Sequence, residues 1–190
     1  MINGINSREM ILEILLEIEE GEHSHVAIRN ALSKYQFLPK QDRAFITRVC
    51  EGTLEYRIQI DYIINSFSKV TVDKMKPAIR EILRSAVYQL KYMDSVPDSA
   101  VCNEAVKLAQ RKGFYNLKPF VNGVLRTIAR EMDQVRFPQK EDDLLKYLSV
   151  KYSMPEVLVT RWLEAYGEET TEKILADFLM EHPLTIRCRT

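Results

Sequence analysis

The sequence predicts an all-α protein, in which a helical bundle is followed by a small helical linker and by the start of a strand. Apolar residues recur three and four positions apart along most of the chain, which is the repeat of amphipathic helices. The segments between these repeats are short, as they are when helices pack against their neighbours in a bundle. The chain has 190 residues, of which 46% are hydrophobic, so it can bury a globular core.

The first two helices are predicted from apolar stripes and from residues that cap helices. The first stripe has the spacing i, i+3, i+4, i+7 and comprises Ile11, Ile14, Leu15 and Ile18. Asn6 is suited to cap the start of this helix, and Gly21 is suited to its end. A second helix is expected after Ser24, with an apolar side formed by Val26, Ala27 and Leu32.

A third helical stretch begins after Pro39 and carries two apolar rows. The first row comprises Phe45, Val49, Gly52 and Tyr56, and the second comprises Ile60, Ile63, Ile64 and Phe67. The offset between the rows predicts a bend or break near Arg57. Gly52 has no side chain, so another helix can approach closely at that position.

The segment Asp73–Met93 is the clearest helix of the sequence. Its apolar face comprises Ile79, Ile82, Leu83, Ala86, Val87 and Leu90. Pro77 fits the first turns, because the N–H groups there have no intrahelical partner. Two more helices are expected after a turn, the first of them ending near Gly113. Their apolar residues are Val101, Ala105, Val106 and Ala109, and then Phe120, Val121, Val124, Leu125 and Ile128.

The chain is expected to divide into three parts, residues 1–136, 137–182 and 183–190. The bundle ends at the polar segment 137–143, and shorter helices follow it. Ser153-Met-Pro-Glu156 fits a capping box at the start of one of them. Gly167 is suited to its end, and a last helix is marked by Ile174, Leu175, Phe178 and Leu179.

The final residues change to an alternating pattern. Leu184, Ile186 and Cys188 alternate with polar residues, which predicts a strand. A lone strand needs partners, and the preceding sequence offers none. We interpret it as the first strand of a longer protein, and an extended tail is the alternative.

The composition bears on where the protein works. No apolar run approaches the roughly 20 residues that span a bilayer, and the N-terminus lacks the features of a secretory signal. The three cysteines, Cys50, Cys102 and Cys188, are odd in number and far apart. We therefore expect the cysteines to be small core residues of a protein in a reducing compartment. We therefore predict a cytoplasmic protein with no membrane partner.

The sequence offers no catalytic machinery. His23, His25 and His182 lie apart from the cysteines, so no metal site is predicted. No glycine-rich phosphate or cofactor loop and no nucleophile-elbow motif is present. We assign no catalytic, metal-binding or cofactor-binding residue to this chain.

The net charge of zero conceals an asymmetry along the chain. Residues 69–130 carry 12 basic and 5 acidic side chains, a net charge of +7, whereas the flanking parts are negative. A polyanion would be attracted to this middle block, which predicts nucleic-acid binding. The candidate RNA-binding residues are Lys76, Arg80, Arg84, Lys91, Lys107, Arg111, Lys112, Lys118, Arg126 and Arg130.

These cations are expected to flank the apolar stripes of three neighbouring helices and to form a groove along a phosphate backbone. Such contacts would position RNA without reading its sequence. The alternative is that they pair locally, for instance Arg80 or Arg84 with carboxylates near Glu81. Four aromatic residues could stack on bases, but core packing is the preferred interpretation for Tyr88, Tyr92, Phe114 and Tyr115.

Several segments occur in a characteristic order. They include Asp42-Arg-Ala-Phe, Glu51-Gly-Thr-Leu, Ile82-Leu-Arg-Ser-Ala-Val-Tyr-Gln-Leu90, Asn103-Glu-Ala-Val106 and Phe120-Val-Asn-Gly-Val-Leu-Arg126. In order and spacing these segments resemble the NusB family over roughly residues 5–130. The resemblance implies a NusB-like helical bundle. Glu55 stands where some members carry a basic residue, so RNA contact on that helix gains no support.

Two kinds of protein carry such a module: free-standing antitermination factors and the Sun (RsmB) family of ribosomal RNA methyltransferases. The residues that follow the bundle resemble the second kind of protein: Tyr147–Trp162 resembles its helical linker, and His182-Pro-Leu-Thr-Ile-Arg187 resembles the first strand that leads towards its catalytic part. This resemblance implies a chain cut before the catalytic domain of an enzyme that methylates carbon 5 of a cytosine in 16S ribosomal RNA. S-adenosylmethionine and two catalytic cysteines would then belong to the part beyond Thr190.

We therefore expect the chain to be a non-catalytic module of a longer parent protein. Its role would be to dock ribosomal RNA, to contact the catalytic domain of that parent, or to do both. By itself the chain should be inactive. A stand-alone antitermination factor and a protein–protein scaffold are the alternatives.

Overall fold

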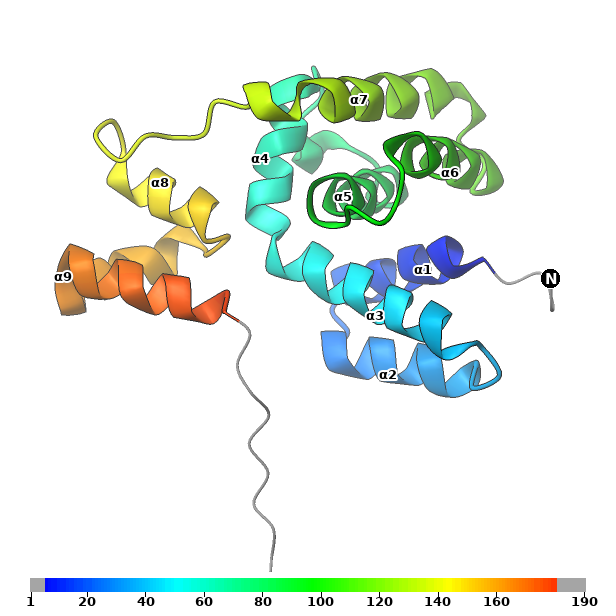
Figure 1. Ribbon diagram of the computed structural model, residues 1–190, viewed down its shortest axis with the longest axis horizontal. Helices are drawn as coiled ribbons and strands as arrows, with labels where there is room; N and C mark the ends of the chain where they lie inside the picture. The colour runs from blue at the N-terminus through cyan, green and yellow to red at the C-terminus, as the bar shows by residue number, and fades with distance from the viewer. Residues whose placement is uncertain (1–5, 181–190) are drawn as a thin grey trace, which may run out of the picture. The chain divides into compact units, whose positions relative to one another are not determined.

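The computed structural model describes residues 6–180, and the chain divides into two compact units, Met1–Arg136 and Phe137–Thr190. Every regular element of the described residues is helical (Figure 1). The all-α prediction is therefore confirmed for that part of the chain. The strand expected at 183–190 lies outside the described residues.

The first unit is built from helices joined by short turns. Its α-helices are α1 (Ser7–Glu19), α2 (Ser24–Lys34), α3 (Lys40–Glu55), α4 (Arg57–Phe67), α5 (Pro77–Tyr92), α6 (Asp98–Arg111) and α7 (Lys118–Glu131). Short 3-10 helices are η1 (Val72–Lys74), η2 (Tyr115–Leu117) and η3 (Met132–Gln134).

Local sequence accounts for several of these boundaries. The side chain of Asn6 accepts a hydrogen bond from the backbone N–H of Arg8 at 2.9 Å, which caps α1 as predicted. The helix predicted from Asp73 begins later, at Pro77, where a missing N–H costs nothing, and Val72–Lys74 forms the separate 3-10 helix η1. The break predicted near Arg57 is also found, because α3 ends at Glu55 and α4 begins at Arg57.

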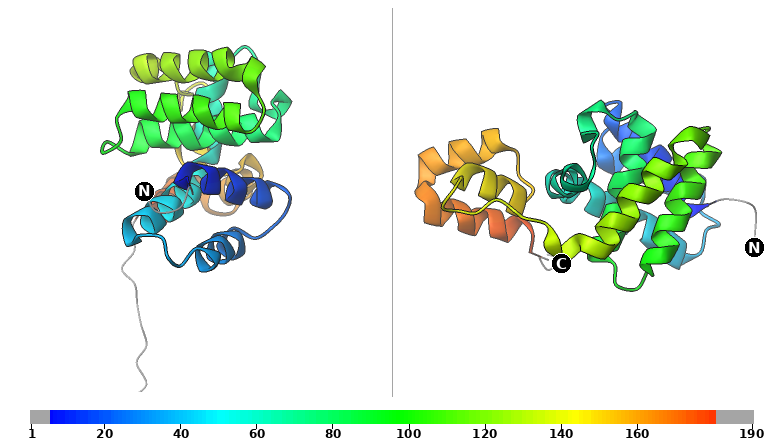
Figure 2. Two further views of the ribbon diagram at one scale, coloured as in Figure 1. Left: turned by 90° about the vertical axis from the view of Figure 1, so that its right-hand side faces the viewer. Right: turned by 90° about the horizontal axis from the view of Figure 1, so that it is seen from above.

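Helix α5 is the centre of the first unit. It contacts α1, α3, α4, α6 and α7, and Figures 1 and 2 show it beside α6 and α7. Residues 81–89 of this helix are all buried. The helix is thus enclosed on every side, and its polar residues must find partners within the protein.

Gly52 of α3 is the site of a close helix contact, as the sequence predicts. A Cβ atom at this position would overlap the ring of Tyr88 from α5. That ring is only 6% exposed, and it lies beside the stacked rings of Tyr56 and Tyr92, whose centroids are 4.2 Å apart. The absent side chain therefore allows α3 and α5 to pack against each other.

The second unit contains α8 (Leu144–Lys151) and α9 (Glu156–Phe178) around a small core. That core is formed by Leu148, Val159 and Leu175. Asp143 caps α8 by accepting the N–H of Lys146 at 2.9 Å. Within α9, Gly167 has a φ of 74°, so the helix is kinked at the residue predicted to end it.

The capping box predicted at Ser153–Glu156 is wrong. Pro155 occupies the N-cap position of α9, and no side chain caps this end. Ser153 has a φ of 52° and lies in the turn between the helices. The turn is instead fastened by Ser149, whose hydroxyl donates to the carbonyl of Met154 at 2.6 Å.

No helix among the described residues is long and apolar enough to cross a membrane. The same part of the chain contains no group of three or more side chains able to hold a metal ion.

Candidate nucleic-acid interface

The first unit gathers cations at one end of the layer formed by α5, α6 and α7. Successive helices of this layer run in opposite directions (Figure 2), so the start of α5, the end of α6 and the start of α7 lie at the same end. One contact verifies the arrangement. The Nζ atom of Lys76, beside α5, lies 5.4 Å from the ring centroid of Phe114, which follows α6.

We define the basic end by four residues: Lys76, Arg111, Tyr115 and Lys118. Lys76 caps α5, Arg111 is the last residue of α6, and Lys118 is the first residue of α7. The two side chains Lys76 and Arg111 are exposed, Lys118 is half-buried, and Tyr115 is 60% exposed. No carboxylate of the described residues forms an ion pair with these three cations.

Backbone dipoles add to the positive potential of the basic end. No side chain caps the start of α5 or α7, so the positive end of each helix dipole is left uncompensated there. Pro77 and Pro119 carry no N–H, and the N–H of Lys118 donates to the carbonyl of Tyr115, so the contribution of these helix starts is mainly electrostatic. Helix N-termini attract anions, phosphate groups in particular. Asp73 in η1 offsets part of this charge, but Lys74 stands beside it. The arrangement suits a polyanion that passes over Tyr115.

Lys112 follows the basic end but is directed elsewhere. Its Nζ atom forms ion pairs with Glu13 at 3.1 Å and with Glu9 at 3.3 Å, both on α1. Its charge is therefore largely compensated within the protein.

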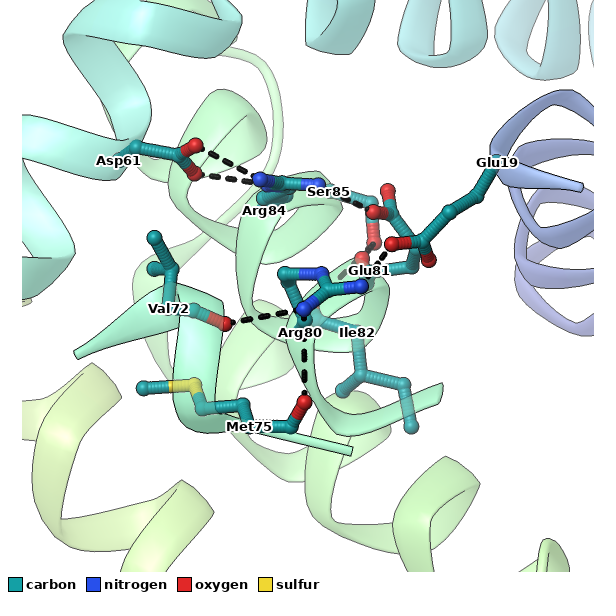
Figure 3. A network of polar contacts seen from close by, with 9 residues as sticks. All are labelled: Glu19, Asp61, Val72, Met75, Arg80, Glu81, Ile82, Arg84 and Ser85. Atoms are coloured by element: carbon teal, nitrogen blue, oxygen red, sulfur yellow. Dashed lines mark hydrogen bonds and ion pairs between the residues drawn. The ribbon is translucent and has the colours of Figure 1, made fainter. Parts of the chain in front are cut away.

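Arg80 and Arg84 correct the sequence-based expectation, because both guanidinium groups are bound by partners within the protein (Figure 3). Arg84 is 4% exposed, and its guanidinium binds both carboxylate oxygens of Asp61 at 2.7 and 2.6 Å. It also binds Glu81 at 2.5 Å. Arg80 pairs with Glu19 and donates to the carbonyl of Val72 at 3.1 Å.

The reason for this inward orientation is that α5 is enclosed by other helices. A buried arginine needs carboxylate partners, and α1, α4 and α5 itself supply them. Burial raises the pKa of Glu81, and the charge of Arg84 offsets only part of that effect. The local pairing considered as an alternative at the sequence level is therefore present at both arginines.

The remaining four candidates are scattered over the surface. Lys91 is half-buried near the other end of α5, and burial lowers its pKa. Lys107 pairs with Glu104 at 2.7 Å, and Arg130 pairs with Glu131 at 2.6 Å. Arg126 donates to the side chain of Asn122 at 2.9 Å. The structure brings none of them to the basic end.

Tyr115 is a functional candidate that sequence reasoning undervalued, because core packing was the preferred interpretation. Tyr88 does pack in the core, but the ring of Tyr115 faces solvent. The sequence feature that could have predicted an exposed Tyr115 is its position between Gly113 and Pro119, in a segment with cations on both sides.

The two described cysteines have no thiolate character. Cys50 is fully buried, and Cys102 is 2% exposed. Burial raises the pKa of both thiols, so neither is an activated nucleophile. Cys188 lies outside the described residues.

Comparison with known proteins places the first unit in a family. The sequence profile of the NusB family matches residues 5–130, and the chain belongs to that family. A transcription antitermination protein NusB from Dictyoglomus thermophilum is 33% identical over 130 residues, which is 68% of this chain and 85% of that protein.

A second kind of relative covers both units. A probable ribosomal RNA small subunit methyltransferase B from Bacillus subtilis is 34% identical over 180 residues. The match takes in 95% of this chain but 40% of the relative, so the chain spans about two fifths of that protein's length.

The fold has been seen in a solved complex. A crystal structure of the antitermination factors NusB and NusE with double-stranded RNA contains a similar chain, with a TM-score of 0.60 and 21% identity. The match covers 65% of this chain and 93% of that one.

Proposed function

We propose that this chain is the non-catalytic N-terminal module of an S-adenosylmethionine-dependent methyltransferase that modifies carbon 5 of a cytosine in 16S ribosomal RNA. One observation carries the proposal. The methyltransferase relative matches both units of the chain, whereas the antitermination proteins match about two thirds of it. The second unit is thus shared with the methyltransferase and not with the free-standing factors.

The role of the module is to dock ribosomal RNA on the basic end. Lys76, Arg111 and Lys118 supply positive charge that no carboxylate of the described residues neutralises. The starts of α5 and α7 add the positive ends of two helix dipoles, which attract phosphate groups. Tyr115 offers an aromatic face on which an unpaired base can stack. Contacts of this kind hold the RNA backbone and leave the choice of nucleotide to another part of the enzyme.

The described residues offer no activated thiol for methyl transfer, because Cys50 and Cys102 are both buried. The sequence also contains no glycine-rich cofactor motif. S-adenosylmethionine would provide the methyl group in the parent, held by residues beyond Thr190. The parent is expected to be cytoplasmic, where ribosomal RNA and reducing conditions are found, and its catalytic domain is the module's protein partner.

The reading frame tests the assignment to a methyltransferase. The codons after Thr190 should continue into glycine-rich turns and a proline–cysteine pair. A stop codon at that point would refute the proposal and favour a stand-alone antitermination factor. That alternative has one specific observation behind it, since the NusB relative is matched over 85% of its own length.

RNA docking is tested by titrating 16S ribosomal RNA fragments with the chain at two salt concentrations. Binding should weaken with salt, with a slope of about 0.7 to 0.9 per phosphate contact on logarithmic axes. The double variant Arg111→Glu and Lys118→Glu should weaken binding to every sequence and reduce that slope. No binding at low salt would leave a protein–protein scaffold as the remaining interpretation.

A matched control separates a local effect from a change in net charge. Arg126→Glu with Arg130→Glu reverses two exposed charges on α7, farther along the helix from the basic end. Equal losses in the two double variants would contradict a localised interface, even if RNA binding itself is observed.

A further inference from the structure

Exposed apolar side chains gather in the second unit. The described residues include eight large hydrophobic side chains that are exposed. Five of these lie between residues 157 and 180, namely Val157, Leu158, Tyr166, Phe178 and Met180. Single exposed apolar residues are ordinary on a protein surface, but a cluster of this kind marks a contact surface.

Three of these side chains join the half-buried Trp162 on one face of α9, which we call the Trp162 face: Leu158, Trp162, Tyr166 and Phe178. The first three follow each other at intervals of four residues, so they lie along one side of the helix before its kink. Phe178 comes from the part beyond Gly167 and stacks on Trp162, with centroids 5.7 Å apart and planes at 6°. The two parts of α9 therefore share the face.

The Trp162 face is continuous with the core of the second unit. Trp162 packs against the buried cluster that contains Leu148, while Phe178 on its other side is 59% exposed. A partner that covered Phe178 would extend this small core. Interfaces of permanent complexes have this character, because they resemble a core that has been divided.

The overall charge of α9 disfavours RNA as the occupant of this face. The helix carries five exposed carboxylates and two exposed cations, namely Glu156, Glu164, Glu168, Glu169 and Asp177, and Arg161 and Lys173. A polyanion would be repelled here, whereas an apolar protein surface would not. The face is therefore distinct in kind from the basic end.

We propose that the Trp162 face docks against the polypeptide that follows Thr190 in the complete protein. This inference rests on the proposed function. Two observations identify the occupant. The methyltransferase relative includes the second unit and is much longer than this chain. Phe178, a member of the face, is also the last residue of α9, and the described part of the chain ends two residues later at the exposed Met180.

The test is hydroxyl-radical footprinting of the complete protein, translated to its own stop codon, compared with the 190-residue chain. Trp162, Tyr166, Phe178 and Met180 should react readily in the short chain and be strongly protected in the complete protein. Phe37 in the first unit is 57% exposed, almost the same as Phe178, and should react equally in both. Unchanged reactivity of the Trp162 face would overturn the proposal.

Two variants of the complete protein locate the effect. Phe178→Lys should restore the reactivity of Trp162 and Tyr166, and the matched change Phe37→Lys should not. Protection that grows with protein concentration would identify a second copy as the occupant and would overturn the proposal. A reading frame that stops at Thr190 contradicts the proposed function as well, whereas a longer frame without protection contradicts this inference alone.

Discussion

Replacing Arg84 by methionine should destabilise the first unit strongly. The substitution keeps much of the side-chain volume but removes the charge that binds Asp61 and Glu81. The side chain of Glu81 is only 5% exposed, and that of Asp61 is 21% exposed. Removing one partner of a buried ion pair costs about 3–5 kcal/mol, because the remaining charge is left without compensation.

The loss should depend on pH in a definite direction. The folded pKa of Glu81 already lies above its unfolded value of 4.5 because of burial, and removing Arg84 raises it further. A raised folded pKa means that the protonated form is tolerated and that stability is lost as pH rises through the folded pKa. The difference between variant and wild type should therefore be larger at about pH 7 than at about pH 4.

Chemical denaturation followed by far-ultraviolet circular dichroism measures this free energy. The protein's single tryptophan, Trp162, lies in the second unit, so its fluorescence gives an internal reference. Arg130→Met is the matched control, since Arg130 is 70% exposed and such surface pairs contribute at most about 1 kcal/mol. A loss below about 1 kcal/mol for Arg84→Met, or one that grows toward acid pH, would refute the reasoning.

Three further predictions concern packing, backbone and thiols. Gly52→Ala should lower the free energy of unfolding by about 1–3 kcal/mol, because the added methyl group overlaps Tyr88. Gly123→Ala is the control and should not destabilise the protein, because the space around Gly123 is open. Equal effects of the two substitutions in chemical denaturation would contradict the close contact. Gly167→Ala should destabilise the second unit by about 1–2 kcal/mol through its positive φ alone, and an unshifted Trp162 transition would argue against the kink. Cys50 and Cys102 should react with a thiol reagent only on unfolding, and fast reaction of either in the folded chain would contradict their burial.

The helices could be predicted from sequence because their signals are local. Asn6 and the offset rows around Arg57 each act within a few residues, and each marks a real boundary. Pro77 also marks a boundary, but the helix was expected to begin four residues earlier, at Asp73. Gly52 also predicted the close contact between α3 and α5 correctly, because a glycine within an apolar row of a helix indicates that another helix packs closely there.

The candidate interface was harder to predict because it depends on contacts between distant residues. Arg84 meets Asp61 from another helix, and Arg80 meets Glu19 across 61 positions of sequence. A helical repeat places such arginines beside an apolar stripe but does not reveal that other helices enclose them. Conversely, the convergence of Lys76 with the loop at Phe114 follows from the alternating directions of three helices.

Transfer of a labelled methyl group from S-adenosylmethionine to 16S ribosomal RNA tests the account most directly. The complete protein should label carbon 5 of a cytosine, and the 190-residue chain alone should not. Arg111→Glu with Lys118→Glu in the complete protein should raise KM for RNA, while Arg126→Glu with Arg130→Glu should leave it unchanged. Absence of transfer by the complete protein, or transfer by the short chain, would contradict the account.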